Sequence, residues 1–145
     1  FRSAGPRLRE SCRAIMAAQN WRPEMPGGVK VTPAFALPSR YVFHTVGPIW
    51  SEYSNKEVAH DVLRSCYSSV LSEMKIRGLR SIALCCVSTG IFGFPQELAA
   101  RIAISEVKSF LKDPENDAAV DLIVFDVWLE ADHDIYKKLA PKFFH

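Results

Sequence analysis

The residues best suited to chemistry form one short segment, residues 88–95, which reads Ser-Thr-Gly-Ile-Phe-Gly-Phe-Pro. An apolar run at residues 81–87 precedes it and is typical of a strand covered on both faces. Pro95 suits the first position of a helix, because its ring fixes φ and no N–H is needed there. Gly90 and Gly93 let backbone N–H groups approach a ligand, and the following helix dipole favours an anion. The segment is therefore either a phosphate-binding turn or an ordinary strand-to-helix connection.

Cysteine and histidine are the other candidates for metal binding or nucleophilic chemistry. Cys12, Cys66, Cys85 and Cys86 contain no Cys-x-x-Cys pair. Reduced, buried thiols are expected rather than disulfides or a metal site within this chain. Cys85 and Cys86 are adjacent on one expected strand, so both should pack on opposite faces. His44, in the middle of another expected strand, is a general base, a zinc ligand or, most simply, a core histidine with its hydrogen bonds satisfied.

The elements that must position these residues alternate between strands and helices. Strands are expected at residues 40–46, 81–87 and 121–129, with a short extended piece at 29–32. Helices are expected from a start at residues 3–6 to about 18, from a capping box at 54–57 to Gly78, from Pro95 to about 112, and at 132–139. This order implies right-handed crossovers and a parallel sheet with helices on its faces.

Ligands bind such sheets beyond the carboxyl ends of the strands. Three segments are expected to meet there, residues 47–50, 88–94 and 128–130. The acidic residues that follow, Glu130, Asp132 and Asp134, are most simply a solvated helix start that suits the helix dipole.

Composition limits the classes of protein that the sequence can encode. The chain has 145 residues, 48% of them hydrophobic and 23% charged, with a net charge of +2. This balance is typical of one soluble domain, and the charge is too small to indicate a nucleic-acid or membrane surface. No apolar run has the length of a membrane span, and no segment resembles a signal peptide. An intracellular, cytoplasmic location is expected.

Four segments carry a longer pattern. Residues 4–12 read Ala-Gly-Pro-x-Leu-x-x-x-Cys, residues 37–48 read Leu-Pro-x-x-Tyr-Val-x-His-Thr-Val-Gly-Pro, residues 88–95 form the glycine turn, and residues 128–136 contain Trp-Leu-Glu and Asp-Ile-Tyr. Their types, order and spacing resemble the macrodomain family, which binds ADP-ribose. The resemblance implies a three-layer α/β/α fold with a mixed, largely parallel sheet.

The resemblance also implies a branch of the family and an incomplete domain. Residues 12–16 and 85–90 are more similar to the zinc-containing microbial macrodomains than to the MacroD-type enzymes. Macrodomains begin with strands and a helix that deliver an Asn-Ala-Ala-Asn segment and a Gly-rich loop, and in the zinc branch also Cys and His ligands. Phe1 matches the family just after that loop. Residues 1–145 are thus expected to be the C-terminal two thirds of a single macrodomain, with its first strands, its catalytic residues and the ligands of a possible zinc ion upstream of Phe1.

The same resemblance assigns roles to residues in this chain. The expected contacts to the diphosphate and distal ribose come from Ser88, Thr89, Gly90, Ile91, Phe92, Gly93 and Phe94. Phe92 resembles the aromatic residue beside the distal ribose, near the scissile bond, and otherwise caps the core. Trp128 stands where the family has an aromatic residue against adenine, and otherwise it is a core residue at a strand end.

The function implied is hydrolysis of mono-ADP-ribose from modified proteins by the complete domain. Its expected partners are ADP-ribose or a mono-ADP-ribosylated protein, with neither nucleic acid nor a membrane. A non-catalytic reader of ADP-ribose would use the same pocket, so this alternative stays open. An inert fragment is the third possibility.

Overall fold

A computed structural model of the chain describes residues 1–144. Along the chain the elements are α1 (Pro6–Ala18), β1 (Val29–Pro33), β2 (Tyr41–Thr45), a 3-10 turn (Trp50–Glu52), α2 (Lys56–Ile76), β3 (Ser81–Cys85), α3 (Gln96–Leu111), α4 (Pro114–Ala119), β4 (Leu122–Asp126) and α5 (Glu130–Phe143). The expected α/β fold is confirmed. Within residues 1–144, no helix is long and apolar enough to span a membrane.

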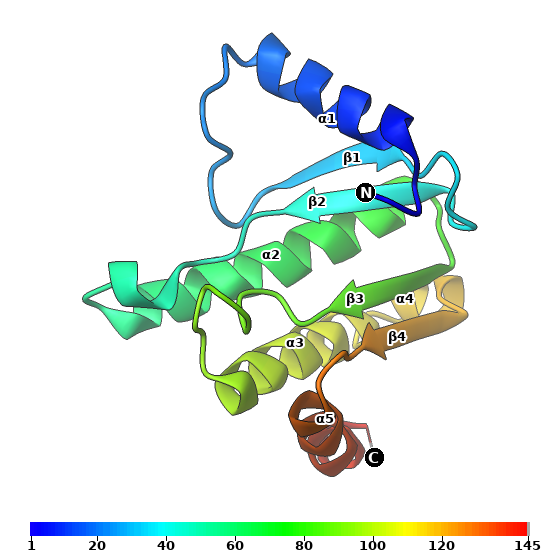
Figure 1. Ribbon diagram of the computed structural model, residues 1–145. Coiled ribbons are helices and arrows are strands. Elements are labelled where there is room, and N and C mark those ends of the chain that lie inside the picture. Colours follow the sequence, from blue (N-terminus) through cyan, green and yellow to red (C-terminus); the bar gives the residue numbers. More distant parts are fainter. Residues whose placement is uncertain (145) are drawn as a thin grey trace.

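The strands form two separate pairs in the described part of the chain. β1 and β2 are antiparallel, whereas β3 and β4 are parallel. Figure 1 shows the arrows of β2, β3 and β4 pointing the same way and β1 pointing back. The expected parallel arrangement is confirmed for three strands, but β2 and β3 share no backbone ladder, so the single sheet expected from the sequence is divided here into two.

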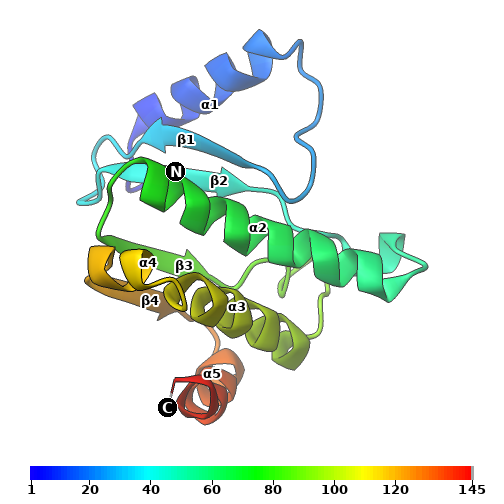
Figure 2. The same cartoon turned by 180° about the vertical axis from the view of Figure 1, so that it is seen from behind.

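Helices cover one face of the strands. Figure 2 shows α2 and α3 in front of the strands when the molecule is seen from behind, with α1 beside β1 and α5 beyond β4. Most of the core lies between α2, α3 and the strands, and its fully buried side chains include Leu63, Leu71, Leu84, Phe94 and Ile104. Burial of each such side chain contributes roughly 1.5–3 kcal/mol.

Local signals explain both ends of α2. The helix α2 begins after Asn55, whose side chain accepts a hydrogen bond from the Glu57 N–H at 3.0 Å. The predicted capping box from Ser54 is therefore one residue early. The predicted end is confirmed, because Gly78 has φ +60 and its N–H donates to the Lys75 carbonyl at 3.0 Å.

Three predicted boundaries were wrong. Pro95 precedes α3 instead of forming its first residue, because its ψ of 125° is extended. The sequence 113–114, expected only to stop a helix, begins α4: Asp113 caps it by accepting from the Glu115 N–H at 2.9 Å. The last helix is longer than residues 132–139 and runs from Glu130 to Phe143.

Candidate functional site

The glycine turn, residues 88–94, connects β3 to α3 and meets the loop that follows β2. The Trp50 N–H donates to the Phe92 carbonyl at 2.8 Å. Gly47 lies so close to Ser88 that a Cβ on Gly47 would overlap the Ser88 hydroxyl. The predicted meeting of residues 47–50 with residues 88–94 is thus confirmed.

Hydrogen bonds within the turn hold its shape. The Gly93 N–H donates to the Gly90 carbonyl at 2.9 Å, and the Phe94 N–H donates to the Ser88 carbonyl at 2.9 Å. Ser88 and Gly93 both adopt left-handed φ values, +65 and +67. A serine in that region stores strain that the surrounding contacts must offset.

The turn leaves backbone donors available beside the start of α3. Within residues 1–144, no protein acceptor pairs with the N–H groups of Thr89, Gly90, Ile91 and Phe92. Gly90 is exposed, and a Cβ built there meets no atom within 4 Å. Free N–H groups next to a helix N-terminus are suited to bind an anion.

The two hydroxyl groups of the turn differ in their surroundings. The Thr89 hydroxyl donates to the Cys86 carbonyl at 3.1 Å, which anchors the turn to the end of β3. The Ser88 Oγ is buried and has no hydrogen-bond partner within the described residues. It lies against Gly47, and among the described residues it is the one buried side-chain polar atom of the turn without a partner.

An aromatic cluster packs against the core side of the turn. Phe94 is 1% exposed and packs against Trp50, with ring centroids 4.7 Å apart. His60 of α2 stacks on Trp50 at 5.8 Å and contacts Phe94 at 5.6 Å. Lys56 completes the cluster, because its Nζ lies 4.5 Å from the Trp50 ring centroid. Phe94 therefore supports the site from the core, while Ile91 is fully exposed and Phe92 is partly buried.

Trp128 lies in the segment after β4, and its side chain is 95% exposed. The alternative that Trp128 is a core residue is therefore wrong. A large aromatic ring left in solvent next to a strand end is available to stack on a ligand.

The acidic segment 130–134 is only partly solvated. Glu130 and Asp134 are exposed as predicted, but Asp132 is 3% exposed. Its Oδ1 accepts a hydrogen bond from the Gln96 side chain at 3.0 Å. Asp132 thus joins the start of α5 to the start of α3, the helix that follows the turn. The sequence missed this contact because it is made across 36 residues.

His44 has the predicted hydrogen bond, but its side chain is half-buried and is not part of the core. Its Nε2 lies 2.9 Å from the Thr32 hydroxyl and 4.0 Å from the Cys12 sulfur. Burial lowers the pKa of His44, so the ring is neutral near pH 7. Its side chain lines a small pocket with Met16 and Met25, apart from the glycine turn.

The cysteines are free, and burial raises the pKa of three of their thiols, those of Cys66, Cys85 and Cys86. Burial raises the pKa of Cys66, and burial together with the charge of Asp132 raises the pKa of Cys86 to about 11. Cys85 is exposed, so the prediction that it packs was wrong. The outer face of β3 is uncovered in the described residues.

Among residues 1–144, no three His, Cys, Asp or Glu side chains are grouped to hold a metal ion.

The contact between Gly47 and Ser88 gives a testable prediction. Gly47→Ala places a Cβ against the Ser88 side chain and the Val87 side chain, so the turn must move. We expect a loss of about 1–3 kcal/mol in the free energy of unfolding, typical of overpacking. Thermal unfolding measures it, with Gly90→Ala as the matched control, because a Cβ at Gly90 meets nothing within 4 Å. Equal midpoints for the two variants would contradict the close approach.

Comparison with known proteins identifies the family. The Macro domain family model matches residues 1–103. Mouse ADP-ribose glycohydrolase MACROD2 is 43% identical over 99% of this chain, and the Treponema medium protein-ADP-ribose hydrolase is 42% identical over 94%. This chain spans only 28% and 50% of those two relatives. Because the two identities are nearly equal, they do not show whether this chain is more similar to the MACROD-type enzymes or to the microbial ones.

Solved structures give the same result for the fold. The Oceanobacillus iheyensis macrodomain with ADP has a TM-score of 0.87 at 33% identity, covering 99% of this chain and 72% of that one. The Trypanosoma brucei macrodomain in complex with ADP-ribose has a TM-score of 0.80 at 38% identity, covering 95% of this chain and 53% of that one. Together with the family match over residues 1–103, these likenesses show that the chain belongs to the Macro domain family.

Proposed function

We propose that this chain forms the ADP-ribose-binding part of a protein that removes mono-ADP-ribose from modified proteins. The observation that carries the proposal is the 42–43% identity, over 94–99% of the chain, to relatives named as ADP-ribose hydrolases. The geometry of residues 88–94 supports it, because this turn combines free backbone donors with a helix start. A diphosphate is the chemical group that such a turn suits best.

The diphosphate would lie over the exposed side of the turn. The free N–H groups of residues 89–92 would donate to its oxygens, and the α3 dipole would favour its charge. Gly90 is the place of closest approach, since it offers backbone without a side chain. Phe92, partly buried, would contact the distal ribose.

The adenine would stack on Trp128. This ring is exposed, whereas Trp50, the other tryptophan near the strand ends, is occupied by His60 and Phe94. Stacking of a base on an aromatic side chain contributes roughly 1–3 kcal/mol. Binding at both ends of the ligand would fix the anomeric carbon for attack, which is the positioning contribution to catalysis.

A zinc ion, expected from the resemblance to the zinc-containing branch, does not fit the residues described here. Within residues 1–144 no group of three potential ligands exists, and the raised pKa values of Cys66 and Cys86 disfavour the thiolates that zinc requires. We therefore assign no step to a metal bound by this chain. The catalytic groups, and any zinc ligands, are proposed to lie outside residues 1–145, upstream of Phe1.

A non-catalytic reader of ADP-ribose is the second candidate, because a site that binds and positions ADP-ribose would serve either function. The names of the relatives favour the hydrolase. We also propose an intracellular location, since the four cysteines are free and disulfides are rare inside cells.

Replacement of Gly90 tests the diphosphate site. Gly90→Val should weaken ADP-ribose binding by at least about tenfold, because a branched side chain would occupy the place of the phosphates. The fold should be unaffected, since nothing lies within 4 Å of the new Cβ. Calorimetry on the protein that carries this chain measures the affinity, and an unchanged affinity in the folded variant would remove residues 88–94 from the site.

Replacement of Trp128 tests the adenine contact. Trp128→Ala should weaken ADP-ribose binding by about one to two decades, equivalent to roughly 1–3 kcal/mol. Trp21→Ala is the matched control, because Trp21 is also exposed but lies between α1 and β1. If both variants bind as the parent does, Trp128 has no role in the site.

The placement of the catalytic groups gives the last prediction of this section. Residues 1–145 alone should not release ADP-ribose from a mono-ADP-ribosylated protein, with or without added zinc. The assay uses the isolated chain, with its fold checked by circular dichroism and its ligand binding by calorimetry. Robust turnover would mean that a catalytic group lies among these residues. Binding without turnover by the complete protein would instead favour the reader.

A further inference from the structure

Asp132 is a buried acidic residue to which the proposed ligand contacts give no role. Its side chain lies in the first turn of α5 and is 3% exposed. Within residues 1–144, the only hydrogen bond that its carboxylate accepts comes from the neutral side-chain amide of Gln96, whose Nε2 lies 3.0 Å from Oδ1. Burial of a carboxylate with a single neutral donor costs free energy, so the stability of the fold does not by itself account for this contact.

The carboxylate of Asp132 also lies near the end of β3. Burial raises the pKa of the Cys86 thiol to about 11, and the negative charge of Asp132 contributes to that rise. Cys86 follows β3 directly, and its carbonyl accepts a hydrogen bond from the Thr89 hydroxyl at 3.1 Å. Asp132 is therefore close to both ends of the glycine turn, where β3 leads into it and where α3 leads away.

The hydrogen bond between Asp132 and Gln96 joins the two segments that carry the proposed ligand contacts. Gln96 is the first residue of α3 and directly follows Pro95, just after the glycine turn. Asp132 belongs to α5, which begins at Glu130, shortly after Trp128. Among the described residues, this is the only hydrogen bond between α3 and α5.

The other contacts between α3 and α5 are less directional. The two helices pack together, and their buried side chains share one apolar cluster that includes Ile102 and Leu139. Apolar burial has no preferred direction, whereas a hydrogen bond weakens quickly when its distance or angle changes. The contact between Asp132 and Gln96 therefore fixes how the start of α5 lies against the start of α3.

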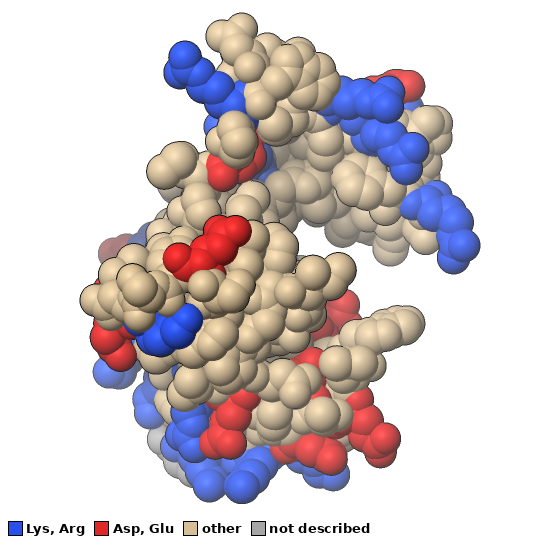
Figure 3. Space-filling model, turned by 60° about the vertical axis from the view of Figure 1, so that its left-hand side comes forward, with Lys and Arg blue, Asp and Glu red and all other residues tan. Residues whose placement is uncertain are grey.

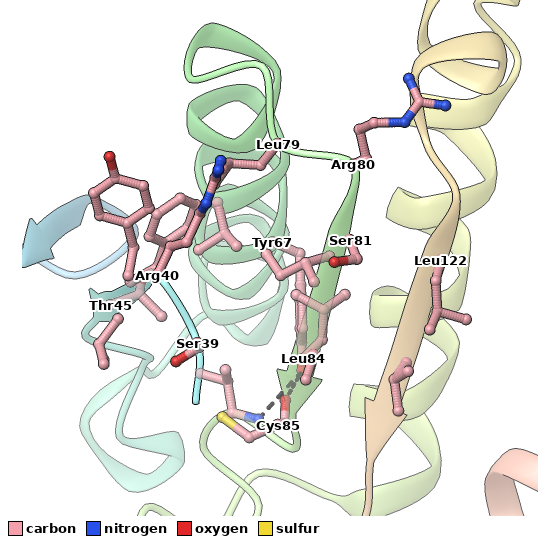
Figure 4. A pocket seen from close by; sticks show the side chains of 18 of the residues that line it. Ser39, Arg40, Thr45, Tyr67, Leu79, Arg80, Ser81, Leu84, Cys85 and Leu122 are labelled. Carbon is pink, nitrogen blue, oxygen red and sulfur yellow. Dashed lines mark hydrogen bonds between the residues drawn. The ribbon is translucent and has the colours of Figure 1, made fainter. Parts of the chain in front are cut away.

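The position of Trp128 depends on this contact because its segment is short. Only residues 127–129 separate β4 from α5. The β4 end of this segment is held by the ladder, in which Asp126 lies opposite Cys85. Figure 4 shows Tyr67 and Cys85 close together at the end of β3, where the Tyr67 hydroxyl donates to the Cys85 carbonyl at 3.0 Å. The α5 end is held by Asp132.

We propose that Asp132 is a positioning residue that sets the distance between Trp128 and the glycine turn through its hydrogen bond with Gln96. The inference rests on the proposed function, because it takes adenine to stack on Trp128 and the diphosphate to lie on residues 88–94. Asp132 is buried and contacts neither group. It favours ligands in which a base and a diphosphate are joined at the distance that the site holds, as they are in ADP-ribose.

A ligand with two binding groups is sensitive to this distance in a way that its separate parts are not. When one group is bound, the second binds with an effective concentration that depends on how well the two halves of the site are held in place. Loss of the hydrogen bond lowers that effective concentration. The affinity of each half for its own group stays the same.

Three ligands measured on the protein that carries this chain test the proposal. Asp132→Ala should weaken ADP-ribose binding at least about tenfold, as measured by calorimetry. Binding of adenosine, which occupies only the Trp128 half, and of inorganic diphosphate, which occupies only the turn, should change by less than about threefold. Titrations followed by NMR measure these weaker affinities, and circular dichroism confirms that the variant is folded.

Two control variants separate the hydrogen bond from the charge. Asp132→Asn removes the charge but keeps an oxygen that can accept from Gln96, so its ADP-ribose affinity should stay within about threefold of the parent's. Figure 3 shows acidic side chains on the surface of the lower part of the molecule, where Figure 1 places α5. Asp134 is one of the exposed acidic residues of this helix. Asp134→Ala removes the same charge without the hydrogen bond and should bind all three ligands as the parent does.

Gln96→Ala gives the same test from the other side of the contact. Gln96 is half-buried at the surface end of α3, so this variant carries the test if Asp132→Ala does not fold. The two single variants and the double variant should lose ADP-ribose affinity by similar factors, because each removes the same interaction. Losses that multiply in the double variant would mean that the two residues act independently.

Four results would overturn the proposal. Folded Asp132→Ala binds ADP-ribose as the parent does, or it loses affinity for all three ligands by the same factor, or Asp132→Asn binds as poorly as Asp132→Ala, or the losses multiply in the double variant. Failure of the proposed site is seen separately: if Gly90→Val and Trp128→Ala both bind ADP-ribose normally, the site is wrong and this inference falls with it. No arm measures turnover, so a protein that binds ADP-ribose without hydrolysing it would leave the inference standing.

Discussion

The structure depends on the contacts that one face of α2 makes with the ends of the strands. The hydroxyls of Ser65 and Ser69 both donate to the Gly27 carbonyl at 3.0 Å, and the Cys66 thiol contacts the Val46 carbonyl at 3.4 Å. Tyr67, the next residue of α2 after Cys66, donates its hydroxyl to the Cys85 carbonyl at the end of β3 at 3.0 Å. The two sheets share no ladder within residues 1–144, so these hydrogen bonds and the buried side chains around them set where β2 lies relative to β3.

That placement makes the candidate site possible. The loops that bound it follow β2 and β3, and they meet at Gly47 and Ser88 with no room for a side chain on the glycine. A small rotation of one sheet against the other would separate the Trp50 N–H from the Phe92 carbonyl and release the turn. The free amides of residues 89–92 are aligned by packing in the core, since Phe94, Trp50 and His60 hold the turn from below.

Local signals in the sequence predicted the strands, the turn and every described α-helix except α4, because capping, proline and glycine effects act over a few residues. The end of α2 at Gly78 and the strand before Ser88 are examples. The sequence could not predict the burial of Asp132 or the role of Gly47, which depend on contacts with Gln96 and Ser88 more than thirty residues away. The prediction that Cys85 packs against the core was wrong because the local pattern of its strand does not match the burial in the structure. Its strand has an apolar pattern suited to two covered faces, and only one is covered in the described chain.

The mismatch between pattern and burial extends from β3 to its neighbour β4. Alternating residues of β3 and β4 are apolar although they face solvent, as Val124 does, and such a pattern is stable only when that face and its edge are covered. β3 leads directly into residues 88–94, and within residues 1–144 its last carbonyl accepts a hydrogen bond only from the Tyr67 hydroxyl. The order of the turn therefore depends on the position of β3 and on the close approach of Ser88 to Gly47, because the strained backbone of Ser88 needs support from its neighbours.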